Sequence, residues 1–185
     1  MRVVAGKFKG HSLSTPRDEC IRPTSDRVRE SLFNILEHGL PDFELEGARV
    51  LDLFAGTGAL GIEALSRGAK YCLFIENAAS ARGIIRTNVE ALHLTGITKI
   101  WRRDATTLGP AGKVEAFDLV LADPPYTKGL GERALIEARD MGWIKPGSIA
   151  ILEEHKDAAP DIPHGFVELD KRSYGDTLIV ILRAD

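Results

Sequence analysis

Residues 49–68, "RVLDLFAGTGALGIEALSRG", contain the pattern that decides the fold. The apolar run "RVLDLFA" predicts a buried strand, and "GALGIEALSRG" predicts the helix that follows it. Gly56, Gly58 and Gly61 satisfy the G-x-G-x-x-G spacing where the two meet. Glycine lets the backbone approach a ligand closely, and the first N–H groups of a helix can bind an anionic group. A tight turn without a ligand gives the same spacing, so other residues have to show whether this loop binds a ligand.

Strand and helix patterns alternate from this point almost to the end of the chain. Apolar runs rich in β-branched or aromatic residues predict further strands at 70–76, 97–102, 117–123 and 148–154. Helical patterns lie between them at 77–96 and 132–143. This alternation predicts an α/β fold in which helices cover both faces of a parallel sheet. The pair Gly175-Asp176 between two apolar runs predicts an antiparallel hairpin at the end.

The first 40 residues differ in character from this core. Short extended stretches around "GKFKG" predict a hairpin, and "RPTSDRVRESLFNILEHG" predicts a helix. Thr24 or Ser25 would cap the helix, Gly39 would end it, and its arginines would lie largely opposite its apolar face. We expect one domain over 1–185, with an N-terminal extension at 1–40 and the core at 47–185.

Charge is unevenly distributed along the chain. The formal net charge is −3, yet residues 1–29 hold seven Lys or Arg against three Asp or Glu. A basic segment on an acidic body suits a polyanionic partner, although an exposed tail with scattered cations has the same composition. The candidates to bind phosphate groups are Lys7, Lys9, Arg22, Arg27 and Arg29.

The cysteines and the hydropathy of the chain indicate where in the cell the protein is found. Cys20 and Cys72 have no metal-ligand spacing and are expected to be reduced thiols, so no metal site is predicted. No run approaches 18 consecutive apolar residues, and the N-terminus lacks a signal-peptide pattern. We therefore expect a cytoplasmic protein that is neither secreted nor inserted in a membrane.

Acidic residues follow several of the predicted strands. Glu76 ends one strand, Asp104 follows the next, and "ADPPYTKG" (122–129) follows another. Each alone fits a helix cap, a turn or a chain reversal. Together they would lie at the carboxyl edge of the sheet, where ligands of parallel sheets bind. The Glu76 carboxylate could accept hydrogen bonds from both hydroxyls of a ribose, which indicates a nucleoside-containing ligand.

A dinucleotide-dependent dehydrogenase shares the glycine pattern and the following acid. Asp52 argues against it, because a carboxylate inside the first strand would repel a pyrophosphate and would favour a cationic ligand amine. Alternatively, Asp52 pairs with a cation of the protein such as Arg27 or Arg29.

"DPPY" (123–126) offers chemistry suited to an exocyclic base amine. The Asp123 carboxylate and the Pro124 carbonyl could accept both amine hydrogens, which would free the nitrogen lone pair to attack a methyl group. Pro125 would stiffen the loop, and Tyr126 would stack on the base unless it is an ordinary packing residue.

At this point the sequence resembles a known family. "LDLFAGTGALGIEALSRGA", "FIE", "RRDA" and "DPPY" resemble successive motifs of S-adenosylmethionine-dependent amino-methyltransferases. More narrowly, "RVVAGKFKG", "RPTSDRVRESLFNIL" and "YGDT" resemble the bacterial 16S rRNA guanine-N2 methyltransferases of the guanine-966 type. The resemblance implies a Rossmann-like, seven-stranded, mostly parallel sheet with an antiparallel last strand.

The resemblance also implies a cofactor and roles for the site residues. S-adenosyl-L-methionine would have its methionine part near Asp52, Gly56 and Gly58, its ribose at Glu76, and its adenine at Asp104 and Ala105. Phe54 and Asn77 are further candidates for cofactor binding. Asp123, Pro124, Pro125 and Tyr126 would hold the guanine amine.

The implied substrate is 16S rRNA, either free or in the small ribosomal subunit, and a monomer is expected. Two alternatives stay open. One is an adenine-N6 methyltransferase acting on DNA or RNA, and the other is a non-catalytic RNA-binding module.

Overall fold

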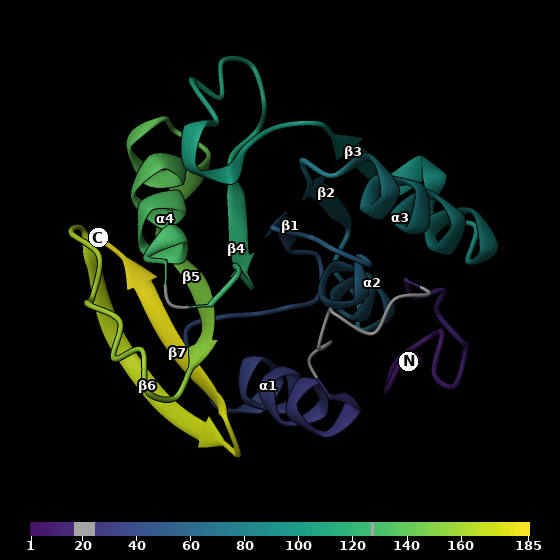
Figure 1. Cartoon of the computed structure of the whole chain (residues 1–185), viewed down its shortest axis with the longest axis horizontal. Coiled ribbons are helices and arrows are strands. Elements are labelled where there is room, and N and C mark those ends of the chain that lie inside the picture. The colour runs from purple at the N-terminus through teal and green to yellow at the C-terminus, as the bar shows by residue number, and fades with distance from the viewer. Residues whose placement is uncertain (17–24, 127) are drawn as a thin grey trace.

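The protein is built on one seven-stranded sheet (Figure 1). The computed structural model describes residues 1–16, 25–126 and 128–185. The sheet has the order β3-β2-β1-β4-β5-β7-β6. Its strands are β1 Arg49–Leu53, β2 Tyr71–Ile75, β3 Thr98–Trp101, β4 Phe117–Ala122, β5 Ile144–His155, β6 Phe166–Tyr174 and β7 Thr177–Ala184. β7 runs antiparallel to both of its neighbours, whereas β1 to β5 pair in parallel, so the expected α/β sheet with a reversed last strand is confirmed.

Helices cover both faces of the sheet. The described helices are α1 Asp26–His38, α2 Ala59–Ser66, α3 Ala79–Ala91 and α4 Leu130–Asp140, with short 3-10 turns η1 Thr95–Ile97 and η2 Ala105–Thr107. Apolar residues of α1, α2 and α3 pack on one face, and those of α4 and η2 pack on the other. Because side chains alternate along a strand, Val50 and Asp52 face α2 while Leu51 and Leu53 face the opposite layer.

Parallel pairing brings the ends of β1 to β4 to one level, next to Leu152 within β5. Trp101 pairs with Ile75, Ile75 with Leu53, Leu53 with Ala122, and Ala122 with Leu152. The loops that follow β1 to β4 therefore leave the sheet along one edge, as expected for ligand-binding loops of a parallel sheet, while β5 continues to His155.

The N-terminal extension matches its prediction in part. The chain reverses around Gly6 to Gly10, and an isolated antiparallel bridge joins Arg2 and Ser12, but the described residues form no named strand there. In α1, Ser25 is the N-cap and its side chain accepts a hydrogen bond from Val28 N–H, while Gly39 is the C-cap, as predicted.

Arg29 corrects the expectation that the arginines of α1 face solvent. Its side chain is completely buried. One guanidinium nitrogen donates to Asp26 at 2.8 Å, and Nε lies 3.7 Å from the buried carboxylate of Glu63 on α2. Arg67 approaches the same carboxylate at 2.8 Å. A buried carboxylate between two cations offsets the cost of removing all three charges from water.

The described helices include none that is long and apolar enough to span a lipid bilayer.

Replacing Glu63 by Gln should lower the free energy of unfolding by about 3 kcal/mol, because Arg29 and Arg67 would lose the buried carboxylate between them and keep only Asp26 and Glu37 as partners. Urea unfolding of the purified variant measures this loss. Glu30→Gln, on the exposed side of α1, is the matched control. A loss no larger than that of the control would contradict the role given to the buried carboxylate.

Candidate nucleotide and methyl-acceptor site

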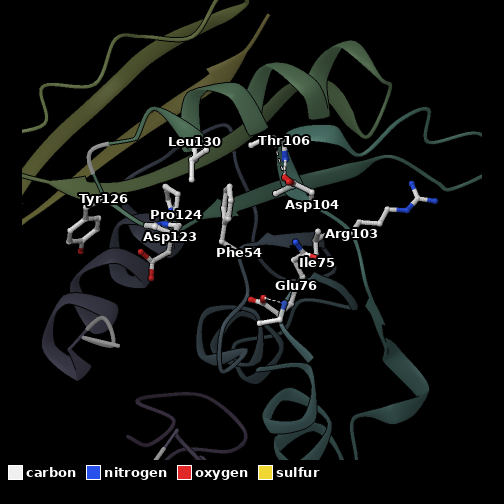
Figure 2. Close-up of a pocket in the computed structure, with 14 residues that line it drawn as sticks. Phe54, Ile75, Glu76, Arg103, Asp104, Thr106, Asp123, Pro124, Tyr126 and Leu130 are labelled. Carbon is white, nitrogen blue, oxygen red and sulfur yellow. Dashed lines mark hydrogen bonds between the residues drawn. The ribbon is translucent and has the colours of Figure 1, made fainter. Parts of the chain in front are cut away.

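One cavity of about 770 Å³ follows the carboxyl edge of the sheet. It brings together nine of the predicted site residues, which are Phe54, Glu76, Asn77, Asp104, Ala105, Asp123, Pro124, Pro125 and Tyr126. Figure 2 shows Tyr126 and Asp123 toward one end, Glu76 and Asp104 toward the other, and Phe54 between them. The volume lies in the usual range for ligand pockets. Glu76, Asp104 and the "DPPY" loop, which follow three different strands, thus line one continuous cavity.

Glycines shape the loop beneath this cavity. Gly56 and Gly58 have φ values of 55° and 78°, which side chains adopt rarely, and Gly58 is the N-cap of α2. The Gly56 N–H donates to Glu76 Oε2 at 2.9 Å. Neither glycine is among the residues that line the cavity, so their direct contact with a cofactor stays a prediction.

Asp52 is not among the residues that line the cavity, so its contact with a cofactor stays a prediction. Its side chain faces α2, is 1% exposed, and accepts a hydrogen bond from the Gly61 N–H at 3.0 Å. Among the described residues it makes no ion pair, so the proposed pairing with Arg27 or Arg29 is absent there. Burial raises the pKa of Asp52 from 3.8 to about 7, against the lowering effect of the Gly61 hydrogen bond. Asp52 thus anchors the first turn of α2 from below the loop.

Glu76 is held in place by backbone groups. Its two carboxylate oxygens accept hydrogen bonds from the Gly56 N–H and, at 2.7 Å, from the Ala78 N–H. Arg82 donates to the carbonyls of Glu76 and Asn77, which fixes the chain just after β2. Each carboxylate oxygen can accept a second hydrogen bond, so Glu76 can still bind ribose hydroxyls.

Asp104 and Ala105 form the far end of the cavity. Asp104 caps η2, because its Oδ1 accepts hydrogen bonds from the Thr106 hydroxyl at 2.7 Å and the Thr106 N–H at 2.8 Å. These hydrogen bonds lower the pKa of Asp104. Ala105 is buried beside it, and together with Ile75 and Phe54 it gives this end apolar walls suited to a flat ring.

The "DPPY" loop leaves β4 at the opposite end. Asp123 is half-buried, Pro124 is buried and Pro125 is exposed. A Cβ on Gly131 would lie 2.3 Å from Leu152 and 3.1 Å from Pro124, so the first turn of α4 packs closely against the loop. Gly131 was not predicted as a site residue, because it lies just before the helix predicted at 132–143.

Tyr126 is fixed by a residue that the sequence reading also missed. Its hydroxyl donates to Oε1 of Glu153 at 2.9 Å, and its ring lies 5.9 Å from that of His155. Burial and the negative charge of Glu153 raise the pKa of Tyr126, so the phenol stays protonated at neutral pH. Glu153 is 3% exposed and follows Leu152 on β5, one position beyond the shared strand level.

The predicted phosphate-binding residues have different fates. Lys7, Lys9 and Arg27 are exposed. Arg22 lies outside the described residues. Arg29 is buried in the ion pairs described above, so it is not available to a phosphate group.

Residues 1–16, 25–126 and 128–185 contain no cluster of His, Cys, Asp or Glu that could hold a metal ion.

The pH dependence of stability should report the burial of Asp52. The folded protein holds a proton on Asp52 up to about pH 7, whereas the unfolded chain releases it near pH 3.8. Asp52 therefore reduces stability progressively as pH rises from about 4 to 7, and Asp52→Asn removes this effect. Urea titration measures the free energy of unfolding of both proteins. The difference between them, Asp52→Asn minus wild type, should increase by up to about 4 kcal/mol as pH rises from about 4 to 7. A constant difference between the two proteins from pH 4 to 8 would contradict the burial of the carboxyl.

Comparison with known proteins agrees with this architecture. The YlbH protein of Bacillus subtilis is 35% identical over 99% of this chain and 98% of its own length. Ribosomal RNA small subunit methyltransferase D of Haemophilus influenzae is 32% identical over 95% of this chain and 89% of its own. The solved structure of the yhhF protein of Escherichia coli has a TM-score of 0.84 and 28% identity, covering 100% of this chain and 98% of that one.

These relatives confirm the resemblance to small-subunit rRNA methyltransferases that the motifs indicate. The family model described as conserved hypothetical protein 95 matches residues 1–183. The chain therefore belongs to the conserved hypothetical protein 95 family.

Proposed function

We propose that this protein is an S-adenosylmethionine-dependent methyltransferase that methylates the exocyclic N2 amine of a guanine in 16S rRNA. The observation that carries the proposal is the single cavity that joins Glu76 and Asp104 to the "DPPY" loop. The names of the relatives support rRNA of the small subunit as the substrate, and guanine 966 is the expected position. Action on rRNA would place the protein in the cytoplasm, and we expect it to work as a monomer.

The residues present fit the cofactor. Glu76 offers carboxylate oxygens to a ribose, Asp104 offers an acceptor to an adenine amine, and Phe54 and Ile75 supply apolar contact. When bound, S-adenosylmethionine supplies an electrophilic methyl group on a positively charged sulfur.

At the end of the cavity formed by the "DPPY" loop, one side chain and one backbone carbonyl can orient the acceptor nitrogen. The Asp123 carboxylate and the Pro124 carbonyl would each accept one amine hydrogen, which favours a pyramidal nitrogen with its lone pair directed at the methyl carbon. Transfer would form an N–C bond as the S–C bond of the donor breaks, would leave S-adenosylhomocysteine, and would release the extra proton on the nitrogen to water. No base has to remove a proton before attack, so holding the geometry supplies most of the acceleration.

Tyr126 would hold the plane of the base. Base–aromatic stacking is typically worth about 1–3 kcal/mol. The hydrogen bond to Glu153 limits rotation of the ring, so less entropy is lost when the base binds. The target guanine must leave any helix in which it stacks, because the amine of a stacked base cannot reach the cavity.

Asp123→Ala should lower methyl transfer by about 100-fold or more, because it removes the carboxylate that would hold the acceptor amine. Binding of S-adenosylhomocysteine should stay intact. Transfer is measured with labelled cofactor on unmethylated small subunits and on free 16S rRNA, and affinity is measured by calorimetry, with NAD as a control ligand. Asp42→Ala, an exposed aspartate at the other edge of the sheet, is the matched control.

Mass spectrometry of the digested rRNA identifies the product of the same reaction. N2-methylguanosine is expected. Recovery of N6-methyladenosine would replace the guanine assignment by an adenine-N6 activity, and binding of RNA without any transfer would indicate a non-catalytic RNA-binding module.

RNA affinity should depend on the exposed cations of the N-terminal extension, residues 1–40. Replacing both Lys9 and Arg27 by Ala should reduce the slope of log K against log salt by about 0.7–0.9 for each cation that contacts a phosphate. Filter binding at four salt concentrations measures the slope. The double variant Lys113→Ala, Lys171→Ala removes two exposed cations elsewhere. Equal slopes for the two double variants would refute the role of this extension.

A further inference from the structure

The first 14 residues, here called the N-terminal segment, are attached to the core by polar side chains of α2. The buried carboxylate of Glu63 accepts hydrogen bonds from the Val4 N–H at 2.8 Å and the Ala5 N–H at 3.0 Å. Ser66 accepts another from the Phe8 N–H at 3.0 Å. Figure 1 shows the N-terminus next to α2, on the side away from α4. The segment that carries the exposed Lys7 and Lys9 therefore rests on the helix that begins at the glycine loop.

Asn88 of α3 extends this attachment to the glycine loop itself. Its side chain is almost completely buried, at 2% exposure. Oδ1 accepts a hydrogen bond from the Ser14 N–H at 2.7 Å, and Nδ2 donates to the Ser14 carbonyl at 3.1 Å. The second N–H of the same amide donates to the Thr57 carbonyl at 3.0 Å. One amide group thus holds the backbone of two segments that are distant in sequence.

Thr57 lies at the centre of the loop that supports the cofactor end of the cavity. It stands between Gly58, the N-cap of α2, and Gly56, whose N–H donates to Glu76 at 2.9 Å. Glu76 lines the cavity. A continuous series of hydrogen bonds and single peptide units therefore connects Ser14, through Asn88, to the residue proposed to bind the ribose.

We propose that Asn88 is a positioning residue that couples RNA binding by the N-terminal segment to cofactor binding at the glycine loop. The proposal rests on the proposed function, because it needs both ligands. RNA bound to the segment restricts the position of Ser14, and the Asn88 amide then favours the Thr57 carbonyl position that keeps Gly56 and Glu76 in register. Coupling between two binding sites is reciprocal, so the cofactor strengthens RNA binding by the same factor.

A purely structural role for Asn88 would change stability and leave the coupling intact. The measurement is the dissociation constant of S-adenosylhomocysteine, by calorimetry, with and without a saturating 16S rRNA fragment that the protein methylates. For the wild type, RNA should tighten binding by about fivefold or more. Asn88→Asp keeps the acceptor for the Ser14 N–H but places a carboxylate oxygen against the carbonyls of Ser14 and Thr57, so the ratio should fall to about one.

Three further measurements make the outcome decisive. Asn34→Asp makes the same chemical change at an exposed asparagine of α1 and should retain the wild-type ratio. Asn88→Ala removes the hydrogen bonds without adding charge and carries the test if Asn88→Asp does not fold. Thermal unfolding of each variant separates loss of stability from loss of coupling.

A wild-type ratio of one, or an unchanged ratio in both Asn88 variants, would overturn the coupling. In either case methyl transfer by the wild type would leave the proposed function standing. Absence of S-adenosylhomocysteine binding to the wild type would instead overturn the proposed function.

Discussion

The parallel register of five strands is the constraint on which the site depends. Because Trp101, Ile75, Leu53 and Ala122 end their strands at one level, the loops that follow them leave the sheet together, next to Leu152 within β5. Phe54, Glu76 and Asp123 begin three of these loops and line the cavity, and Glu153, the residue after Leu152 on β5, holds Tyr126. The buried apolar runs that define the strands thus also determine where ribose, methyl group and base amine could meet. A shift of one strand by one residue would move its loop and turn its core side chains to the opposite face.

The glycine loop has a role in packing. A Cβ on Gly61 would lie 2.5 Å from Phe74, 2.6 Å from Cys72 Sγ and 2.9 Å from Asp52 Oδ2. The third glycine of the pattern therefore lets α2 approach β1 and β2 closely enough for its N–H to reach the Asp52 carboxylate. The spacing that indicates a nucleotide loop in the sequence is required here in part by helix–sheet contact, which explains why the pattern alone is a weak functional signal.

The sequence predicted those features that arise from local periodicity or from sheet topology. Periodicity located the strands of the core, and residue type indicated Thr24 or Ser25 as the cap of α1, of which the structure has Ser25. Topology correctly placed Glu76, Asp104 and Asp123 in one cavity. Prediction from the sequence failed where the environment of a side chain depends on residues far along the chain. Arg29 lies on a helix whose apolar face was predicted, but its burial depends on Glu63, which helical periodicity in α1 cannot reveal.

The attachment of the N-terminal segment explains why several polar side chains on α2 and α3 are buried. A segment with little regular structure of its own must still satisfy its backbone N–H groups, because a buried unpaired group is costly. Glu63, Ser66 and Asn88 satisfy them from helix positions that would otherwise pack apolar side chains. Hydrogen bonds are directional, so they fix the position of the segment more narrowly than apolar contact would. RNA bound to this segment would therefore act on α2 and on the loop at its first turn, because the same hydrogen bonds hold the segment and the loop.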